Sequence, residues 1–109
     1  MRSRVPSLQM RSEIRKLGQD IAIARRRRRF TQARVAEGAG LDVGTVQRLE
    51  RGYPGVSLGA LAMVLLVLSE TGRLGRLLDM AEDDLGLALG AADLPKRVRP
   101  RKPKGGEGF

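Results

Sequence analysis

The chain has 109 residues, enough for one domain with a modest hydrophobic core but not for two. It contains no cysteine and no histidine, which excludes disulfides, thiolate or imidazole metal sites and Cys–His nucleophile pairs. The net charge is +9, with both ends basic and the middle neutral to acidic, a layout that suits a polyanionic partner. The N-terminus lacks the apolar segment of a secretory signal, and no apolar run approaches the ~20 residues of a membrane span. We therefore expect a cytoplasmic protein without a membrane partner.

Residues 1–11 are expected to form a flexible basic arm, and residues 12–28 the first helix. Ser12 can cap this helix, because a serine hydroxyl accepts a hydrogen bond from a free amide of the first turn. Apolar residues recur along the segment at spacings of three and four, the stripe of an amphipathic helix: Ile14, Leu17, Ile21 and Ala24.

Two short helices are predicted next, separated by a three-residue turn. The first begins after Thr31, a capping residue, and ends at Gly40, because glycine readily adopts the left-handed conformation that stops a helix. The second begins after Asp42, whose carboxylate can accept from the free amides of its first turn, and ends at Gly52.

The segment from Gln32 to Glu50 resembles the DNA-binding helix-turn-helix of the Cro/lambda-repressor (Xre) family. The match consists of a small residue where two helices approach closely, a glycine at the turn and an apolar pair that anchors the second helix: Ala36, Gly40, Val46 and Leu49. The resemblance implies an all-α, five-helix lambda-repressor-like domain over residues 12–81 that binds double-stranded operator DNA. An ordinary helical hairpin is the alternative.

This resemblance implies that the second helix enters the major groove, with its outer residues facing the bases: Val43, Gly44, Thr45, Gln47 and Arg48. Arg48 is the main candidate for reading sequence, because a guanidinium can bridge O6 and N7 of guanine. Gly44 departs from family members that carry a polar residue there, so specificity can depend more on DNA shape. Thr31 and Gln32, at the start of the first motif helix, are implied to hold a phosphate. The alternative for each of these residues is plain solvent exposure.

The run Arg25–Arg29 cannot face one ligand, because consecutive helical positions differ by ~100° in direction. The family resemblance implies that Arg25 forms a structural ion pair with Glu50. Arg28 and Arg29, next to the motif, are candidates for phosphate contacts. Their alternative is solvated charge that favourably meets the negative end of the helix dipole.

A further helix is predicted from a cap at Ser57 to Leu68, with one stripe of apolar residues, Leu58, Leu61, Val64, Leu65 and Leu68, and others on the remaining faces. A helix that is apolar almost all round requires cover on more than one side. A twofold homodimer would supply this cover, or the next predicted helix, roughly 72–81, would supply it within one chain.

Residues 82–94 are expected to form an extension for dimerisation or partner docking. Its leucines alternate over residues 84–90, which favours a short strand that pairs across a dimer, with an irregular helix as the alternative. Residues 95–109, rich in proline, glycine and basic residues, are expected to form a disordered tail that contacts phosphate or a partner protein.

Taken together, "LGQDIAIARRRRRFTQ", "RGYPGVSLGALAMVLLVL", "DDLGLAL" and "LPKRVR" resemble, over about residues 16–99, the HipB-like antitoxins found beside HipA-type serine/threonine kinases. This implies a bacterial, nucleoid-associated dimer that represses its own operon and binds the kinase. A stand-alone Xre-family regulator without a kinase partner is the alternative. No enzyme activity, metal or cofactor is expected, since Asp83 and Asp84 without a base or metal read as acidic surface or a helix cap.

Overall fold

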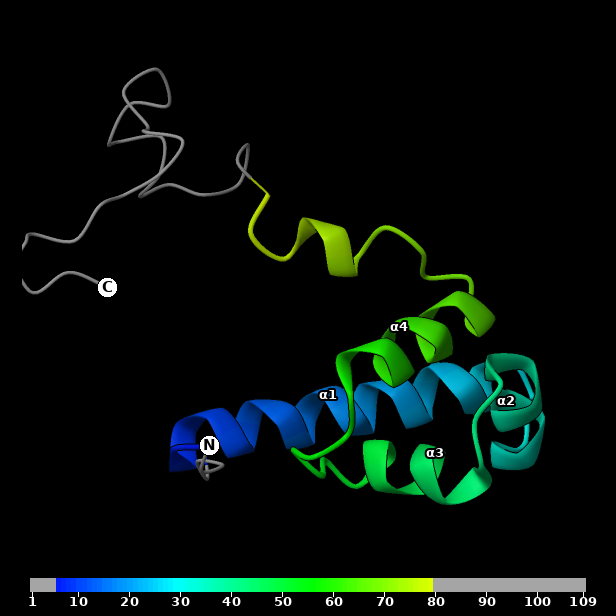
Figure 1. Ribbon diagram of the computed structural model, residues 1–109, viewed down its shortest axis with the longest axis horizontal. Helices are drawn as coiled ribbons and strands as arrows, with labels where there is room; N and C mark the ends of the chain where they lie inside the picture. The colour runs from blue at the N-terminus through cyan, green and yellow to red at the C-terminus, as the bar shows by residue number, and fades with distance from the viewer. Residues whose placement is uncertain (1–5, 80–109) are drawn as a thin grey trace, which may run out of the picture. The chain divides into compact units, whose positions relative to one another are not determined.

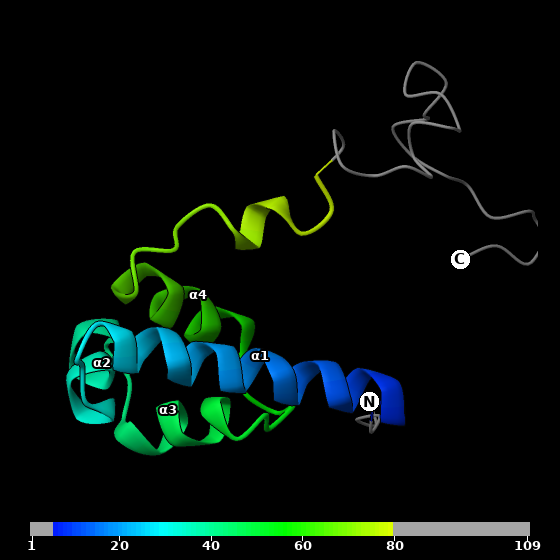
Figure 2. The ribbon, with the colours of Figure 1, turned by 180° about the vertical axis from the view of Figure 1, so that it is seen from behind.

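The computed structural model describes residues 6–79 and divides the chain after Leu74 into two units. The described residues form four α-helices and one 3-10 turn: α1 (Leu8–Arg27), α2 (Gln32–Ala39), α3 (Val43–Glu50), α4 (Leu58–Val67) and η1 (Leu74–Arg76). Residues 6–79 contain no strand, so the described fold is all-α. In the first unit, α2 packs against both α3 and α4, while α3 also packs against α1 (Figures 1 and 2).

The first helix begins earlier than the sequence predicts. Ser7, directly after Pro6, is its cap, and the Ser7 hydroxyl accepts a hydrogen bond of 3.2 Å from the Met10 amide. Ser12 is therefore not the cap, and residues 8–11, assigned to the basic arm, belong to α1. Both serines have the same capping chemistry, and Ser7 follows a proline, which has no amide hydrogen to donate and is tolerated at helix starts.

The buried face of α1 agrees only in part with the predicted stripe, since Ile21 is buried and Ala24 packs partly buried against the core. Gly18, Ile21 and Ala22 are buried, whereas Leu17 is 39% exposed. A Cβ built on Gly18 would lie 2.5 Å from the Leu49 carbonyl oxygen, so the glycine allows the end of α3 to approach the backbone of α1. The contact surface is thus set by the smallest residues, which a count of large apolar side chains does not weigh.

The two short helices begin and end as predicted. The Thr31 hydroxyl accepts from the Arg34 amide at 3.0 Å, and Gly40 ends α2 in the left-handed region with φ of 71°. Asp42 is the residue that precedes α3, but its side chain caps no backbone amide and accepts instead from the hydroxyl of Thr45. The expected capping role of the Asp42 carboxylate is therefore wrong, and its hydrogen bond goes to a side chain of the first turn instead.

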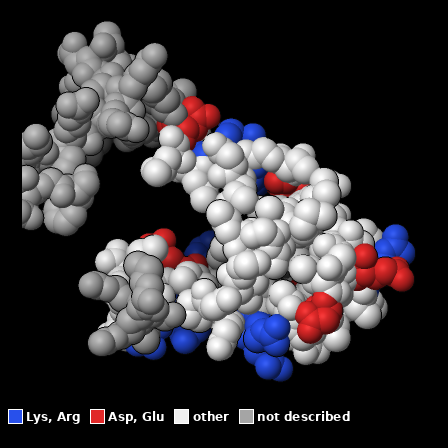
Figure 3. Space-filling view, in the orientation of Figure 1, with Lys and Arg blue, Asp and Glu red and all other residues white. Residues whose placement is uncertain are grey.

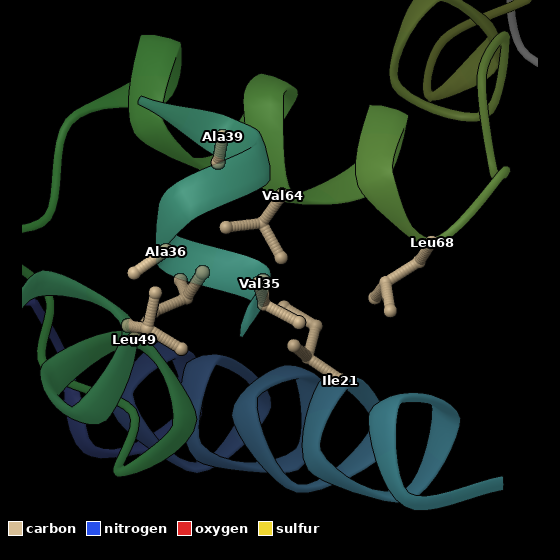
Figure 4. Close-up of a cluster of buried hydrophobic side chains, with 8 residues drawn as sticks. Ile21, Val35, Ala36, Ala39, Leu49, Val64 and Leu68 are labelled. Atoms are coloured by element: carbon tan, nitrogen blue, oxygen red, sulfur yellow. The ribbon is translucent and has the colours of Figure 1, made fainter. Parts of the chain in front are cut away.

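One hydrophobic core joins all four helices. It consists of Ile21 from α1, Val35, Ala36 and Ala39 from α2, Val46 and Leu49 from α3, and Val64 and Leu68 from α4 and its end. Figure 4 shows the Val64 and Leu49 side chains directed from separate helices toward α2. Val46 and Leu49 thus anchor α3 as predicted, and the opposite side of α3 faces outward.

The fourth helix has its predicted cap, and its buried face agrees in part with the predicted stripe, since Val64 and Leu68 are buried and Leu61 packs against the core. The Ser57 hydroxyl accepts from the Ala60 amide at 3.0 Å. Ala60, Val64 and Leu68 are buried, while Leu58 is 67% exposed. Because α4 is apolar on every side, its composition alone does not select a buried face.

The predicted helix over 72–81 is not formed in its described part. Only the 3-10 turn Leu74–Arg76 is present, and Gly72 has φ of 93°. Gly72 and Gly75 each disfavour an α-helix by about 1 kcal/mol relative to alanine. The predicted strand over 84–90 and the tail 95–109 lie outside the described residues. Among residues 6–79, none of the helices is long and apolar enough to cross a membrane.

Candidate nucleic-acid interface

A bidentate ion pair connects the end of α1 with the end of α3. Arg25 Nε donates to Glu50 Oε2 at 2.6 Å, and Arg25 Nη2 donates to Glu50 Oε1 at 3.1 Å. The side chains are only 12% and 7% exposed. Arg25 Nη1 also donates to the Phe30 carbonyl at 2.9 Å, which ties in the turn before α2. The ion pair implied by the family resemblance is present, and it fixes the position of the end of α3 relative to α1.

The two residues at the start of α2 have intramolecular partners. Gln32 Nε2 donates to Glu50 Oε1 at 2.9 Å, so this side chain completes the hydrogen bonding of the buried carboxylate. The Thr31 hydroxyl caps the Arg34 amide. The donors that this end of α2 can still offer to an anion are the first backbone amides of the helix, at the positive end of its dipole.

The outer side of α3 brings the predicted base-facing residues onto one surface. Val43 and Arg48 are exposed, while Gly44, Thr45 and Gln47 are half-buried. Positions three and four apart lie on the same helix face, so these residues are contiguous. In Figure 3 basic side chains, with an acidic group beside them, lie along the lower edge of the molecule. The structure therefore places a polar, arginine-bearing surface opposite the anchored side of α3.

Arg48 is held in a defined position on this surface. Its Nη2 donates to Thr45 Oγ1 at 3.1 Å, and the Thr45 hydroxyl in turn donates to Asp42 Oδ1. The Thr45 hydroxyl and, to a lesser degree, the Arg48 charge lower the pKa of Asp42 below its ordinary value. The carboxylate is therefore ionised at neutral pH, and the Arg48 guanidinium is exposed and pre-positioned by a single hydrogen bond.

A groove of about 480 Å³ runs beside this surface, between α1 and α3. It is lined by Gln19, Ala22, Ile23, Arg26, Gln32, Gln47, Glu50 and Arg51. Within the described residues, neither Arg26 nor Arg51 has an ion-pair partner. Neither arginine is predicted as a site residue by the sequence, because their proximity depends on the packing of α1 against α3.

The two arginines predicted at the end of α1 have different surroundings. Arg28 Nη1 donates to the Ala24 carbonyl at 2.8 Å, and its Nη2 pairs with Glu70 Oε2 at 3.3 Å. Glu70 also pairs with Arg73 at 2.7 Å. Arg28 is thus bound on the α4 side of the unit, away from α3, and the structure does not bring it to the candidate interface. Arg29 is exposed in the turn before α2, with φ of 58°.

Comparison of the chain with protein-family models, with curated proteins and with solved structures finds no match. Over residues 6–79 there is also no group of three acidic side chains that could hold a metal ion.

Proposed function

We propose that the protein is a sequence-specific, double-stranded DNA-binding transcriptional repressor with a lambda-repressor-like helix-turn-helix. The observation that carries this proposal is the division of α3 into two sides. Val46 and Leu49 are buried and Glu50 is paired with Arg25, while Arg48 projects from the opposite side. A recognition helix requires this combination, because base reading needs a rigid backbone behind the side chains that contact the bases.

The dimensions of α3 suit a B-DNA major groove. An α-helix with its side chains is about 10–12 Å across, which fits a groove about 12 Å wide, and the eight residues of α3 span about 12 Å of length within it. Arg48 would donate two hydrogen bonds to O6 and N7 of guanine. Gln47, on the same face, would contact adenine or a phosphate, and Val43 a thymine methyl group.

Groups around α3 would hold the DNA backbone. The backbone amides at the start of α2 suit one phosphate. Arg26 and Arg51, which line the protein groove between α1 and α3, suit others. Such contacts are independent of sequence and depend strongly on salt, because each neutralised phosphate releases counterions. The net charge of +9 favours the encounter with DNA.

Selection from a pool of random duplexes tests the proposal. The protein should enrich a defined site, and Arg48→Ala should lower its preference for that site over scrambled duplex by about 5- to 100-fold. Arg27→Ala is the matched control, because Arg27 is an exposed arginine of α1 that does not line the groove. If no site is enriched, or if both variants keep the full preference, α3 does not read DNA.

The resemblance to HipB-like antitoxins extends the proposal to a homodimer that represses its own operon in the bacterial nucleoid and binds a HipA-type kinase. The exposed apolar side chains of α4, among them Leu58 and Leu66, support an additional protein contact. Co-purification from the native host separates this version from a stand-alone Xre-like regulator. A co-purified kinase whose activity falls on addition of the protein supports the antitoxin, and DNA without a kinase supports the stand-alone regulator.

A further inference from the structure

A donor and an acceptor flank the only α3 position without a side chain. A Cβ built on Gly44 would lie 3.3 Å from Arg48 Nη1 and 3.4 Å from Asp42 Oδ2. The Thr45 hydroxyl bridges the same two side chains through Arg48 Nη2 and Asp42 Oδ1. Each side chain therefore uses one polar atom to bind Thr45 and presents the other beside the open space at Gly44.

We infer that Asp42 is a second base-reading residue, and that Asp42 and Arg48 together select a G·C base pair. This inference rests on the proposed function, in which α3 faces the major groove. Asp42 was expected only to cap α3, and its carboxylate caps no backbone amide. Asp42 is exposed, and its Oδ2 lies beside Gly44.

The two side chains complement the major-groove edge of this pair. Guanine presents two acceptors there, N7 and O6, and the paired cytosine presents the N4 amino donor. The Arg48 guanidinium carries only donors, and an ionised carboxylate carries only acceptors. The arginine disfavours adenine, whose N6 amino group is a donor, and the aspartate disfavours thymine, whose O4 is an acceptor.

Gly44 allows this arrangement. A Cβ at position 44 would already contact both polar atoms, so a larger side chain there would compete with a base for the space between them. The absence of a contact residue at this position is thus compensated by its neighbours, and Gly44 acts as a positioning residue. The bridge through Thr45 limits the freedom that Arg48 would lose on binding.

Modified bases in the selected site test the role of Asp42. N4-methylcytosine still pairs with guanine but carries a methyl group on the amino nitrogen that the carboxylate would contact. The wild-type chain should bind the modified duplex more weakly than the unmodified one, by about 5-fold or more. Asp42→Ala, which removes the acceptor and leaves room for the methyl group, should bind the two duplexes equally.

A second variant separates base reading from side-chain positioning. Asp42→Asn keeps an oxygen for the Thr45 hydroxyl but replaces Oδ2 by an amide donor, so the preference for G·C should fall although Arg48 keeps its support. The inference is overturned if Asp42→Asn retains the wild-type preference, or if methylation weakens wild type and Asp42→Ala equally. A failure of the proposed function differs, because wild type would then enrich no site at all.

Discussion

Arg25 and Glu50 join the last turns of α1 and α3 by two hydrogen bonds, and Glu50 Oε1 also accepts from Gln32 at the start of α2. The buried Glu50 carboxylate therefore holds α3, the start of α2 and the end of α1 in fixed positions relative to one another. Desolvation makes such a pair a weak source of net stability, but it is costly to break. Its contribution is to the placement of α3 relative to the core.

Replacement of Glu50 by alanine should lower the free energy of unfolding by about 3–5 kcal/mol, because it strands the Arg25 guanidinium at 12% exposure and leaves Gln32 without its acceptor. Urea denaturation followed by circular dichroism measures the change. The exposed pair Lys16–Asp20 is the control, and Asp20→Ala should cost less than about 1 kcal/mol. Equal effects of the two substitutions would show that the buried pair does not hold α3.

The close approach at Gly18 is a second point at which α3 is held. Gly18→Ala would place a Cβ 2.5 Å from the Leu49 carbonyl oxygen, so the two helices must separate, at a cost of about 1–3 kcal/mol or more. Gly59→Ala is the control, because a Cβ on this helical glycine of α4 would meet only Ser57 Oγ at 4.0 Å. Gly59→Ala should therefore raise the melting temperature slightly, through better helix propensity, while Gly18→Ala lowers it.

Local chemistry predicted the start of α2, the stop at Gly40 and the cap of α4, because each depends on a residue within one turn. The buried faces of α1 and α4 were predictable only in part. The apolar stripes indicated the burial of Ile21, Val64 and Leu68, whereas Gly18 is buried by its close approach to the α3 backbone, which hydrophobicity does not weigh. The partner of Arg28 is Glu70, 42 positions away, and no sequence spacing indicates that pair. The candidate surface on α3 was predictable from the family resemblance, whereas the groove beside it depends on tertiary packing.

The two arginines that line the protein groove between α1 and α3, Arg26 and Arg51, should affect the affinity for DNA without affecting sequence preference. If Arg26 and Arg51 contact phosphates, each alanine variant should reduce the slope of log affinity against log salt by about 0.9 and weaken binding to selected and scrambled duplexes alike. Arg27→Ala should leave the slope unchanged, because this neighbour does not line the groove. Fluorescence anisotropy at several salt concentrations measures the slopes. If none of the three variants alters the slope, Arg26 and Arg51 do not contact the DNA phosphates.

The exposed apolar side of α4 leads to a prediction about assembly. Leu66 is 51% exposed on a helix without charged residues, and a second copy of the chain is the proposed cover. Sedimentation equilibrium should show a dimer for the wild type and a monomer for Leu66→Asp. The variant should keep its helical content, because Leu66 lies outside the buried core.

The control for this variant is Val43→Asp, which also replaces an exposed apolar residue by aspartate but lies on the outer side of α3. This protein should remain dimeric. A Leu66→Asp protein that sediments as a dimer would contradict an α4 interface. If Leu66→Asp binds half-sites with wild-type affinity, the substitution affects dimerisation and not the reading of DNA by α3.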